Sequence, residues 1–317
     1  MLFPELRDLI KLKSLVNLAS TIVKRTGSRL QGDYTSLFHG LGVEFETVRP
    51  YVIGDDIRHI DWRVTAKFGR AHIKTFRAEC DRNVFIITDA NAYMRFGTRS
   101  TFKSVQAARL TALLCWQALQ QQDRVGGLIF GDVVKGIQYF KPAKSDASIL
   151  RMLKVLCNKT VNNHAPISVA TAINHVTNIL APQSLVFILG DFNIDSMSNL
   201  EKNLLALSKK CTVVLVPIFD RADRVIPAVG PLLCTNGTNQ VVINTNDMFA
   251  RKKYQELWQS YYISMQKLSR KIKAPLWWVE TTTDLLRFLY GMDKFTWRNE
   301  EYTQQSITQE ENDGRFN

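Results

Sequence analysis

The sequence lacks the short motifs that mark common hydrolases and nucleotide-binding enzymes. It contains no G-x-S-x-G segment and no G-x-x-x-x-G-K-[ST] segment, which argues against the simplest serine-hydrolase and NTPase interpretations. Its 5 histidines form neither an H-x-x-x-H nor an H-E-x-x-H pattern, so we expect no zinc site.

Cysteines and long apolar runs are also scarce. The 5 cysteines are odd in number and include no C-x-x-C pair, which favours thiols used as small core residues in a reducing cytoplasm. No apolar run reaches the roughly 18–20 residues that span a bilayer, and charges interrupt the first twenty positions. The sequence therefore predicts a cytoplasmic protein with neither a signal peptide nor an integral membrane segment.

Positive charge is present in excess, with a net charge of +12. The excess is spread along the chain, its longest basic cluster is Arg251-Lys252-Lys253, and no nucleic-acid-binding module is found. We therefore expect no nucleic-acid partner. A solvated basic surface, which could face an acidic protein partner, is the simpler interpretation.

The chain is organised around the segment from Val84 to Gly97. Its unbroken β-branched and aromatic run, 84–88, predicts a central strand covered on both faces. Asp89 follows this run directly. Because ligand sites of open parallel sheets gather at the carboxyl ends of strands, Asp89 lies where such a site is expected.

Strands and helices alternate after this segment. Strands are predicted at 84–89, 125–130, 185–190 and 212–218, with an antiparallel edge strand at 133–140, extended pieces at 229–234 and 240–244, and a last one at 276–280. Helices are predicted at 101–122, 145–156, 168–180, 196–209, 247–273 and 283–290, and another at 5–24 precedes them. The alternation predicts an α/β protein with a doubly wound sheet and one antiparallel edge strand.

The block from Gly42 to Glu79 has the most distinctive composition in the chain. It predicts short strands near Val43 and Phe45 and over 72–76, with a turn at 54–56. Its acidic and basic residues alternate around aromatic side chains, as in charge-assisted Arg–carboxylate pairs. One interpretation is a buried ion-pair network that clamps the N-terminal region onto the next domain. The other is a surface that binds a ligand or a partner.

This block, with GVEF, RPY, GDDIRHIDWR, TAKFGR and IKTFRAE, resembles domain-of-unknown-function family 58 of bacteria. The whole block from Gly42 to Glu79 is here named the signature block, and the residues in it that carry the resemblance are Glu44, Arg49, Tyr51, Gly54, Asp55, Asp56, Arg58, Asp61, Trp62 and Arg63. The resemblance extends over about residues 20–220. It implies a von Willebrand factor A-like domain that works with a MoxR-type AAA+ ATPase or another protein partner in a chaperone-like or assembly role.

The fold that this resemblance implies often holds Mg²⁺ in a metal-ion-dependent adhesion site built from an Asp-x-Ser-x-Ser loop, a threonine and a second aspartate. The matching positions here are Asp89, Asn91, Tyr93, Ser168 or Thr171, and Asp191. Asp89 and Asp191 match, and the amide oxygen of Asn91 could ligate, but Tyr93 is a poor substitute for a serine. Because Mg²⁺ needs six hard oxygen ligands, a degenerate site is the preferred interpretation, with Mg²⁺ as the only possible cofactor.

Two functions remain open. The first is a non-enzymatic interaction or assembly factor. The second is a metal-dependent hydrolase that uses Asp55, Asp56 and Asp61, or Asp89 and Asp191. No catalytic residue is assigned.

The sequence predicts three regions. An N-terminal region with the signature block spans residues 1–82, and the α/β domain spans 83–292. A polar tail at 293–317 has the composition of a disordered segment.

Overall fold

The structure is a computed structural model, and it describes residues 3–26, 47–52, 57, 60–75, 82–158, 165–192, 197–235 and 240–289. The expected strands near Val43 and Phe45, the expected turn at 54–56 and the polar tail lie outside the described residues.

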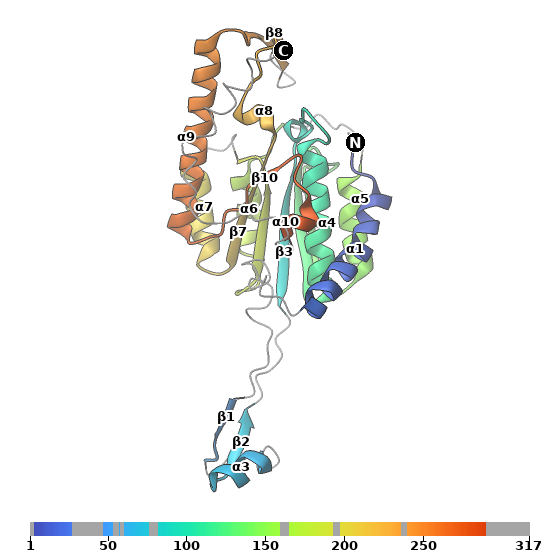
Figure 1. Cartoon of the computed structure of the whole chain (residues 1–317), viewed down its shortest axis with the longest axis vertical. Coiled ribbons are helices and arrows are strands. Elements are labelled where there is room, and N and C mark those ends of the chain that lie inside the picture. Colours follow the sequence, from blue (N-terminus) through green and yellow to red (C-terminus); the bar gives the residue numbers. More distant parts are fainter. Residues whose placement is uncertain are drawn as a thin grey trace.

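A six-stranded sheet forms the centre of the molecule (Figure 1), with the strand order β10-β7-β6-β3-β4-β5. Its strands are β3 (Asn83–Ala90), β4 (Arg124–Gly131), β5 (Ile137–Ala143), β6 (Leu185–Gly190), β7 (Thr212–Phe219) and β10 (Val279–Glu280). All neighbours are parallel except the pair of β4 and β5. The predicted single sheet with one antiparallel edge strand is confirmed, and this is the von Willebrand factor A-like arrangement.

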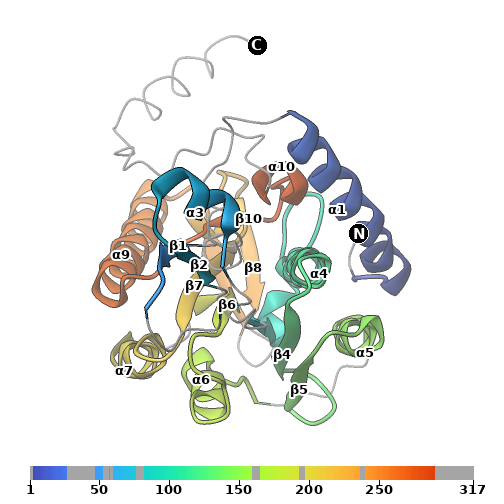
Figure 2. The ribbon, with the colours of Figure 1, turned by 90° about the horizontal axis from the view of Figure 1, so that it is seen from below.

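The central strands are apolar because both faces of the sheet are covered. All residues of β6 are buried, and so are six of the eight residues of β3. Helices α1 (Leu6–Thr26), α4 (Lys103–Gln120), α5 (Asp146–Leu156) and α10 (Leu285–Leu289) cover one face, and α6 (Val169–Thr177), α7 (Met197–Ser208) and α9 (Met248–Ile272) cover the other (Figure 2). Each face therefore has its own hydrophobic core.

Two predicted strands differ from the observed ones. The edge strand β5 begins at Ile137 rather than at 133, because residues 132–136 form the turn that reverses the chain, with Gly136 in the left-handed region at φ +68°. Only Val279–Glu280 of the predicted strand 276–280 belongs to β10, and Leu276 makes an isolated bridge to Leu215.

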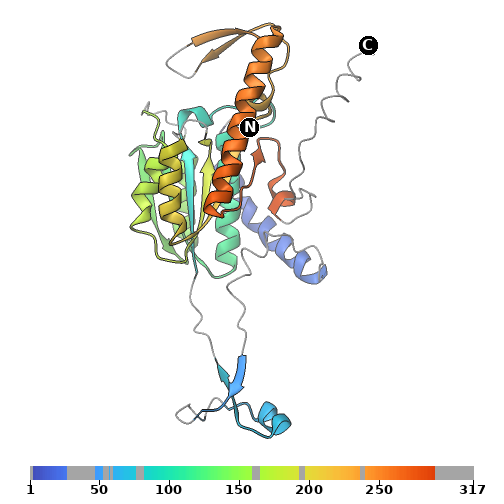
Figure 3. The same ribbon diagram turned by 90° about the vertical axis from the view of Figure 1, so that its left-hand side faces the viewer.

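A hairpin of β8 (Pro231–Thr235) and β9 (Gln240–Asn244) precedes α9. The hairpin projects beyond the carboxyl ends of the parallel strands, beside the N-terminal end of α9 (Figures 1 and 3). Phe249 in the first turn of α9 is 84% exposed. The hairpin and this first turn thus extend away from the sheet at its carboxyl edge.

The described part of the signature block forms a small unit, here named the signature unit. Strand β1 (Thr47–Pro50) pairs antiparallel with β2 (His72–Thr75), and α3 (Trp62–Phe68) lies between them in the chain. Strand β1 was not predicted, since its four residues include a proline and show no alternation. The unit lies apart from the sheet, on the side of the amino ends of the parallel strands (Figures 1 and 3).

Among the described residues, the structure contains no helix that is long and apolar enough to cross a membrane. The cysteines that it describes with their side chains, Cys115, Cys157 and Cys211, are free thiols.

Candidate functional site

Three neighbouring parallel strands each end in an aspartate at the same edge of the sheet. Asp89 belongs to the end of β3, Asp191 follows β6, and Asp220 follows β7. The parallel registers of β3 with β6 and of β6 with β7 bring these ends together. The sequence identified Asp89 and Asp191 but missed Asp220, although the acid after an apolar run was visible there as well.

Asp89 is buried, and both of its carboxylate oxygens accept hydrogen bonds. Oδ1 accepts from the backbone N–H of Asn91 at 2.9 Å and from its Nδ2 at 2.7 Å. Oδ2 accepts from the Tyr93 hydroxyl at 2.7 Å. The aspartate, asparagine and tyrosine at the expected metal-ligand positions therefore bind one another.

The amide of Asn91 also holds the neighbouring loop. Its Oδ1 accepts from the backbone N–H of Ile167 at 2.9 Å, and its Nδ2 lies 2.9 Å from the Ile167 carbonyl oxygen. The next residue, Ser168, caps α6 by accepting from the N–H of Thr171 at 3.0 Å, and the two hydroxyls lie 2.9 Å apart. The two candidate hydroxyl ligands thus stabilise the start of a helix.

Gly190 allows β6 to pack closely against this cluster. A Cβ atom at Gly190 would lie 2.7 Å from the Cβ of Asp89, which is closer than van der Waals contact allows. Burial raises the pKa of Asp89 to about 7, although the hydrogen bonds from Asn91 and Tyr93 favour its charged form. Burial also raises the pKa of Tyr93, and the adjacent Asp89 raises it further, so Tyr93 stays protonated and donates.

The second strand-end acid, Asp191, binds a buried lysine. Lys103 Nζ lies 2.8 Å from Asp191 Oδ2 and 2.9 Å from Asp223 Oδ2, and the lysine side chain is only 4% exposed. Burial alone would lower the pKa of Lys103, but Asp191 and Asp223 more than offset this and raise it. The ammonium is therefore charged, and it neutralises part of the acidic edge.

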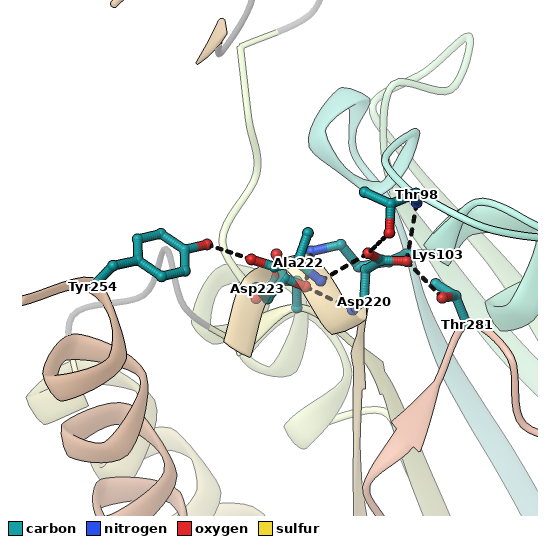
Figure 4. A network of polar contacts seen from close by, with 8 residues as sticks. Thr98, Lys103, Asp220, Ala222, Asp223, Tyr254 and Thr281 are labelled. Atoms are coloured by element: carbon teal, nitrogen blue, oxygen red, sulfur yellow. Dashed lines mark hydrogen bonds and ion pairs between the residues drawn. The ribbon is translucent and has the colours of Figure 1, made fainter. Parts of the chain in front are cut away.

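The third acid, Asp220, is fully buried and joins three segments of the chain (Figure 4). It accepts from the backbone N–H and hydroxyl of Thr98, at 3.1 and 2.5 Å, from the N–H of Ala222 at 3.0 Å, and from the Thr281 hydroxyl at 2.6 Å. Burial opposes its ionisation, but these bonds hold the pKa of Asp220 below its ordinary value. Asp220 is also the N-cap of α8 (Arg221–Arg224).

The same network reaches the helix that follows the β8–β9 hairpin. The Tyr254 hydroxyl in α9 donates to the carbonyl oxygen of Ala222 at 3.0 Å, and Asp223 Oδ2 accepts from the backbone N–H of Asp220 at 2.7 Å (Figure 4). The carboxyl edge of the sheet and α9 are thus tied through α8.

These residues do not fit a bound Mg²⁺. Both Asp89 oxygens accept hydrogen bonds from neighbouring side chains, and a lysine occupies the space between Asp191 and Asp223. In the described parts of the chain, no group of three or more His, Cys, Asp or Glu side chains could hold a metal ion. The oxygen atoms that would have to coordinate Mg²⁺ are therefore already bound to other groups of the protein.

The second acidic cluster considered from the sequence lies in the signature block. Asp61 Oδ1 accepts from the N–H groups of Arg63 and Val64, at 3.0 and 3.1 Å, and so caps α3. Glu44, Gly54, Asp55, Asp56 and Arg58 lie outside the described residues. Of the proposed hydrolase carboxylates, those that the structure describes are engaged in a helix cap, in hydrogen bonds or with Lys103.

The buried-clamp interpretation of the signature block is wrong for its described part. Trp62 is 70% exposed and α3 contains no buried residue, whereas a clamp requires these side chains to be enclosed. The unit also lies apart from the sheet (Figure 1). The physical reason is that the described charges are used locally or face solvent: the Asp61 carboxylate caps α3, and Arg63 is exposed.

The sheet order and the acids at its strand ends define a von Willebrand factor A-like domain. The chain belongs to the family described as "Protein of unknown function DUF58", whose model matches residues 47–261. This confirms the family resemblance seen in the sequence. The match begins at residue 47 rather than at about 20, and it extends to residue 261 rather than to about 220.

Similar proteins occur in mycobacteria. The uncharacterized proteins Mb1516 of Mycobacterium bovis and Rv1480 of Mycobacterium tuberculosis are each 23% identical over 275 residues, which is 86% of this chain and 86% of theirs. The similarity therefore extends over most of both chains.

Two solved structures share part of the architecture. BatB of Bacteroides thetaiotaomicron is 14% identical, with a TM-score of 0.44, over 66% of this chain and 96% of that one. The SpRpn10 VWA domain is 11% identical, with a TM-score of 0.39, over 68% and 96%. The fold assignment itself rests on the strand order and directions of this chain.

Proposed function

We propose that this protein is a non-enzymatic interaction or assembly factor that binds a MoxR-type AAA+ ATPase through the signature unit. The observation that carries the proposal is the exposed apolar surface of that unit. Val52, Ile57, Trp62 and Phe68 are each at least 60% exposed. Exposed aromatic and aliphatic side chains, gathered in one small unit, are typical of protein-binding surfaces.

The charges of the unit indicate the kind of partner surface. Arg63, Lys67 and Arg70 are exposed beside Trp62 and Phe68, and the only acid among its described residues, Asp61, caps α3. A surface on which exposed apolar and basic side chains alternate is complementary to an apolar pocket with acidic residues around it. We therefore propose that the ATPase presents such an acidic pocket.

The carboxyl edge of the sheet supports a role without catalysis or metal. Its acids bind Lys103, Tyr93, Asn91 and backbone N–H groups, so we propose a degenerate adhesion site that stabilises the fold. No observation favours the hydrolase alternative. We retain the cytoplasm as the proposed location and a protein as the proposed partner, with no role for nucleic acid.

Truncating the exposed aromatics should abolish partner binding without unfolding the protein. Buried aromatic anchors at interfaces typically contribute 2 kcal/mol or more, so Trp62→Ala or Phe68→Ala should weaken the affinity roughly 30-fold. Exposed side chains change the free energy of unfolding by only about 0.5 kcal/mol. The affinity for the MoxR-type ATPase of the same organism can be measured by isothermal titration calorimetry, and stability by urea unfolding.

Phe249→Ala is the matched control, because Phe249 is an 84% exposed aromatic in the first turn of α9. The start of α9 lies at the opposite end of the molecule from the signature unit (Figure 1). Phe249→Ala should bind like the wild type. Loss of binding in this variant alone would place the interface at the β8–β9 hairpin and reject the signature unit. If the wild-type protein does not bind the ATPase at all, the proposed partner is wrong.

A further inference from the structure

Lys103 occupies a position that neither helix electrostatics nor solvation explains. It is the first residue of the 18-residue helix α4, where the positive end of the helix dipole disfavours a cation. Its side chain is only 4% exposed, although a lysine is almost never buried unless it is paired. Its position must therefore be stabilised by the groups around it.

Those groups come from all three strand ends. Nζ lies 2.8 Å from Asp191 Oδ2 in the loop after β6 and 2.9 Å from Asp223 Oδ2 in α8 after β7. It also lies 5.3 Å from the ring centre of Phe96 in the loop after β3. A lysine ammonium has three N–H donors, and two carboxylates and an aromatic face surround it here.

Two carboxylates share this single positive charge. The side chains of Asp191 and Asp223 are only 18% and 23% exposed, and their two carboxylates face one ammonium. Asp89 lies close enough to Asp191 to feel its charge. Carboxylate oxygens are also the ligands that Ca²⁺, Mg²⁺ and Mn²⁺ prefer. Ca²⁺–oxygen distances are about 2.3–2.6 Å, so the two oxygens would need to move only a few tenths of an ångström to bind such an ion.

We propose that Lys103 is a built-in cation that takes the structural place of a divalent ion at the carboxyl edge, and that removing its ammonium turns Asp191 and Asp223 into a divalent-cation site. Because this cation is covalently attached, a chelator cannot remove it. It also offers no open coordination position to a carboxylate of a partner protein. This inference does not depend on the identity of the partner.

The test compares melting temperatures in EDTA and in about 1 mM CaCl₂, MgCl₂ or MnCl₂. The wild type should melt at the same temperature in all of them. Lys103→Ala should melt well below the wild type in EDTA and rise by at least about 5 °C with Ca²⁺ or Mn²⁺, as expected for an ion at about 100 times its Kd. Lys271→Ala is the matched control, since its ammonium pairs with Glu201 at the surface, and it should not respond to any ion.

The double variant Lys103→Ala/Asp191→Asn separates the surrogate-cation role from simple packing. With one carboxylate neutralised, it should be more stable in EDTA than Lys103→Ala and should lose the response to divalent ions. A double variant no more stable than the single one, including failure of both to fold, contradicts the proposal. A wild-type melting temperature that rises with Ca²⁺ or Mg²⁺ to the same extent overturns it as well.

Discussion

Replacing Asp220 by alanine should destabilise the protein by roughly 3–5 kcal/mol, which is a large part of a typical free energy of unfolding of about 5–15 kcal/mol. Asp220 is fully buried and accepts hydrogen bonds from Thr98, Ala222 and Thr281. Its removal leaves buried N–H and O–H groups without acceptors, and each such group costs about 1–3 kcal/mol. Urea unfolding followed by circular dichroism measures the effect.

Two further variants make this prediction specific. Asp220→Asn keeps one acceptor oxygen and should fall between the wild type and Asp220→Ala. Glu256→Ala removes an exposed acid from α9 and should change the free energy of unfolding by no more than about 0.5 kcal/mol. If Asp220→Ala is as stable as Glu256→Ala, the network in Figure 4 does not hold the three segments together.

The second large effect should be a dependence of the free energy of unfolding on pH, caused by the titration of Asp89. Burial raises its pKa from 3.8 to about 7 in the folded protein. Between these two values the folded state binds more protons than the unfolded state, so this group's contribution to stability falls as the pH rises from about 4 to 7. At about 1.4 kcal/mol per pKa unit, the full penalty above pH 7 is on the order of 4 kcal/mol.

Asp89→Asn isolates this contribution, because an amide does not titrate. Its oxygen can still accept from Asn91, and its NH₂ group can donate to the Tyr93 hydroxyl, which reverses the direction of that hydrogen bond but keeps the contact. The loss of the Tyr93 donation is the same at every pH in this range, so it does not affect the slope of the comparison. The stability of Asp89→Asn relative to the wild type should therefore increase as the pH rises from 5 to 8.5. A difference between the two proteins that stays constant over this range would show that Asp89 titrates near its ordinary value.

Tyr93→Phe provides a directional control for the same measurement. It removes the hydroxyl that donates to Asp89 Oδ2 at 2.7 Å and thereby favours the charged form. Without this bond the pKa of Asp89 should rise further, which moves the loss of stability to higher pH. A shift toward lower pH would contradict the assigned hydrogen bond.

Local sequence was sufficient for the architecture of the α/β domain. Apolar runs such as 84–88 have one stable environment, the interior of a sheet covered on both faces. The helices were predicted to within a few residues because their apolar residues recur at helical spacing. The predicted strands were wrong where the hydrophobic pattern is weak. Strand β1 has only four residues, one of them a proline, and the start of β5 depends on a turn with Gly136 at positive φ.

The candidate site was only partly visible in the sequence. Asp89 and Asp191 were identified because each lies at a strand end, and Asn91 because it matches a position of the metal-binding loop that the family resemblance implies. Lys103 and Asp223 were not, because a lysine at a helix start and an acid in a short polar segment are unremarkable until they are placed together. Their partnership spans 120 residues of sequence, and neighbouring residues carry no signal of it.

The sequence by itself determined the sheet, its covering helices and the family, since these follow from local hydrophobic pattern and from residue types at fixed spacing. Only the tertiary structure decided which charges meet. It placed Lys103 between Asp191 and Asp223, and it left Trp62 exposed rather than in a buried clamp. The physical reason is that ion pairing and burial depend on distances between segments remote in the chain, which no local pattern encodes.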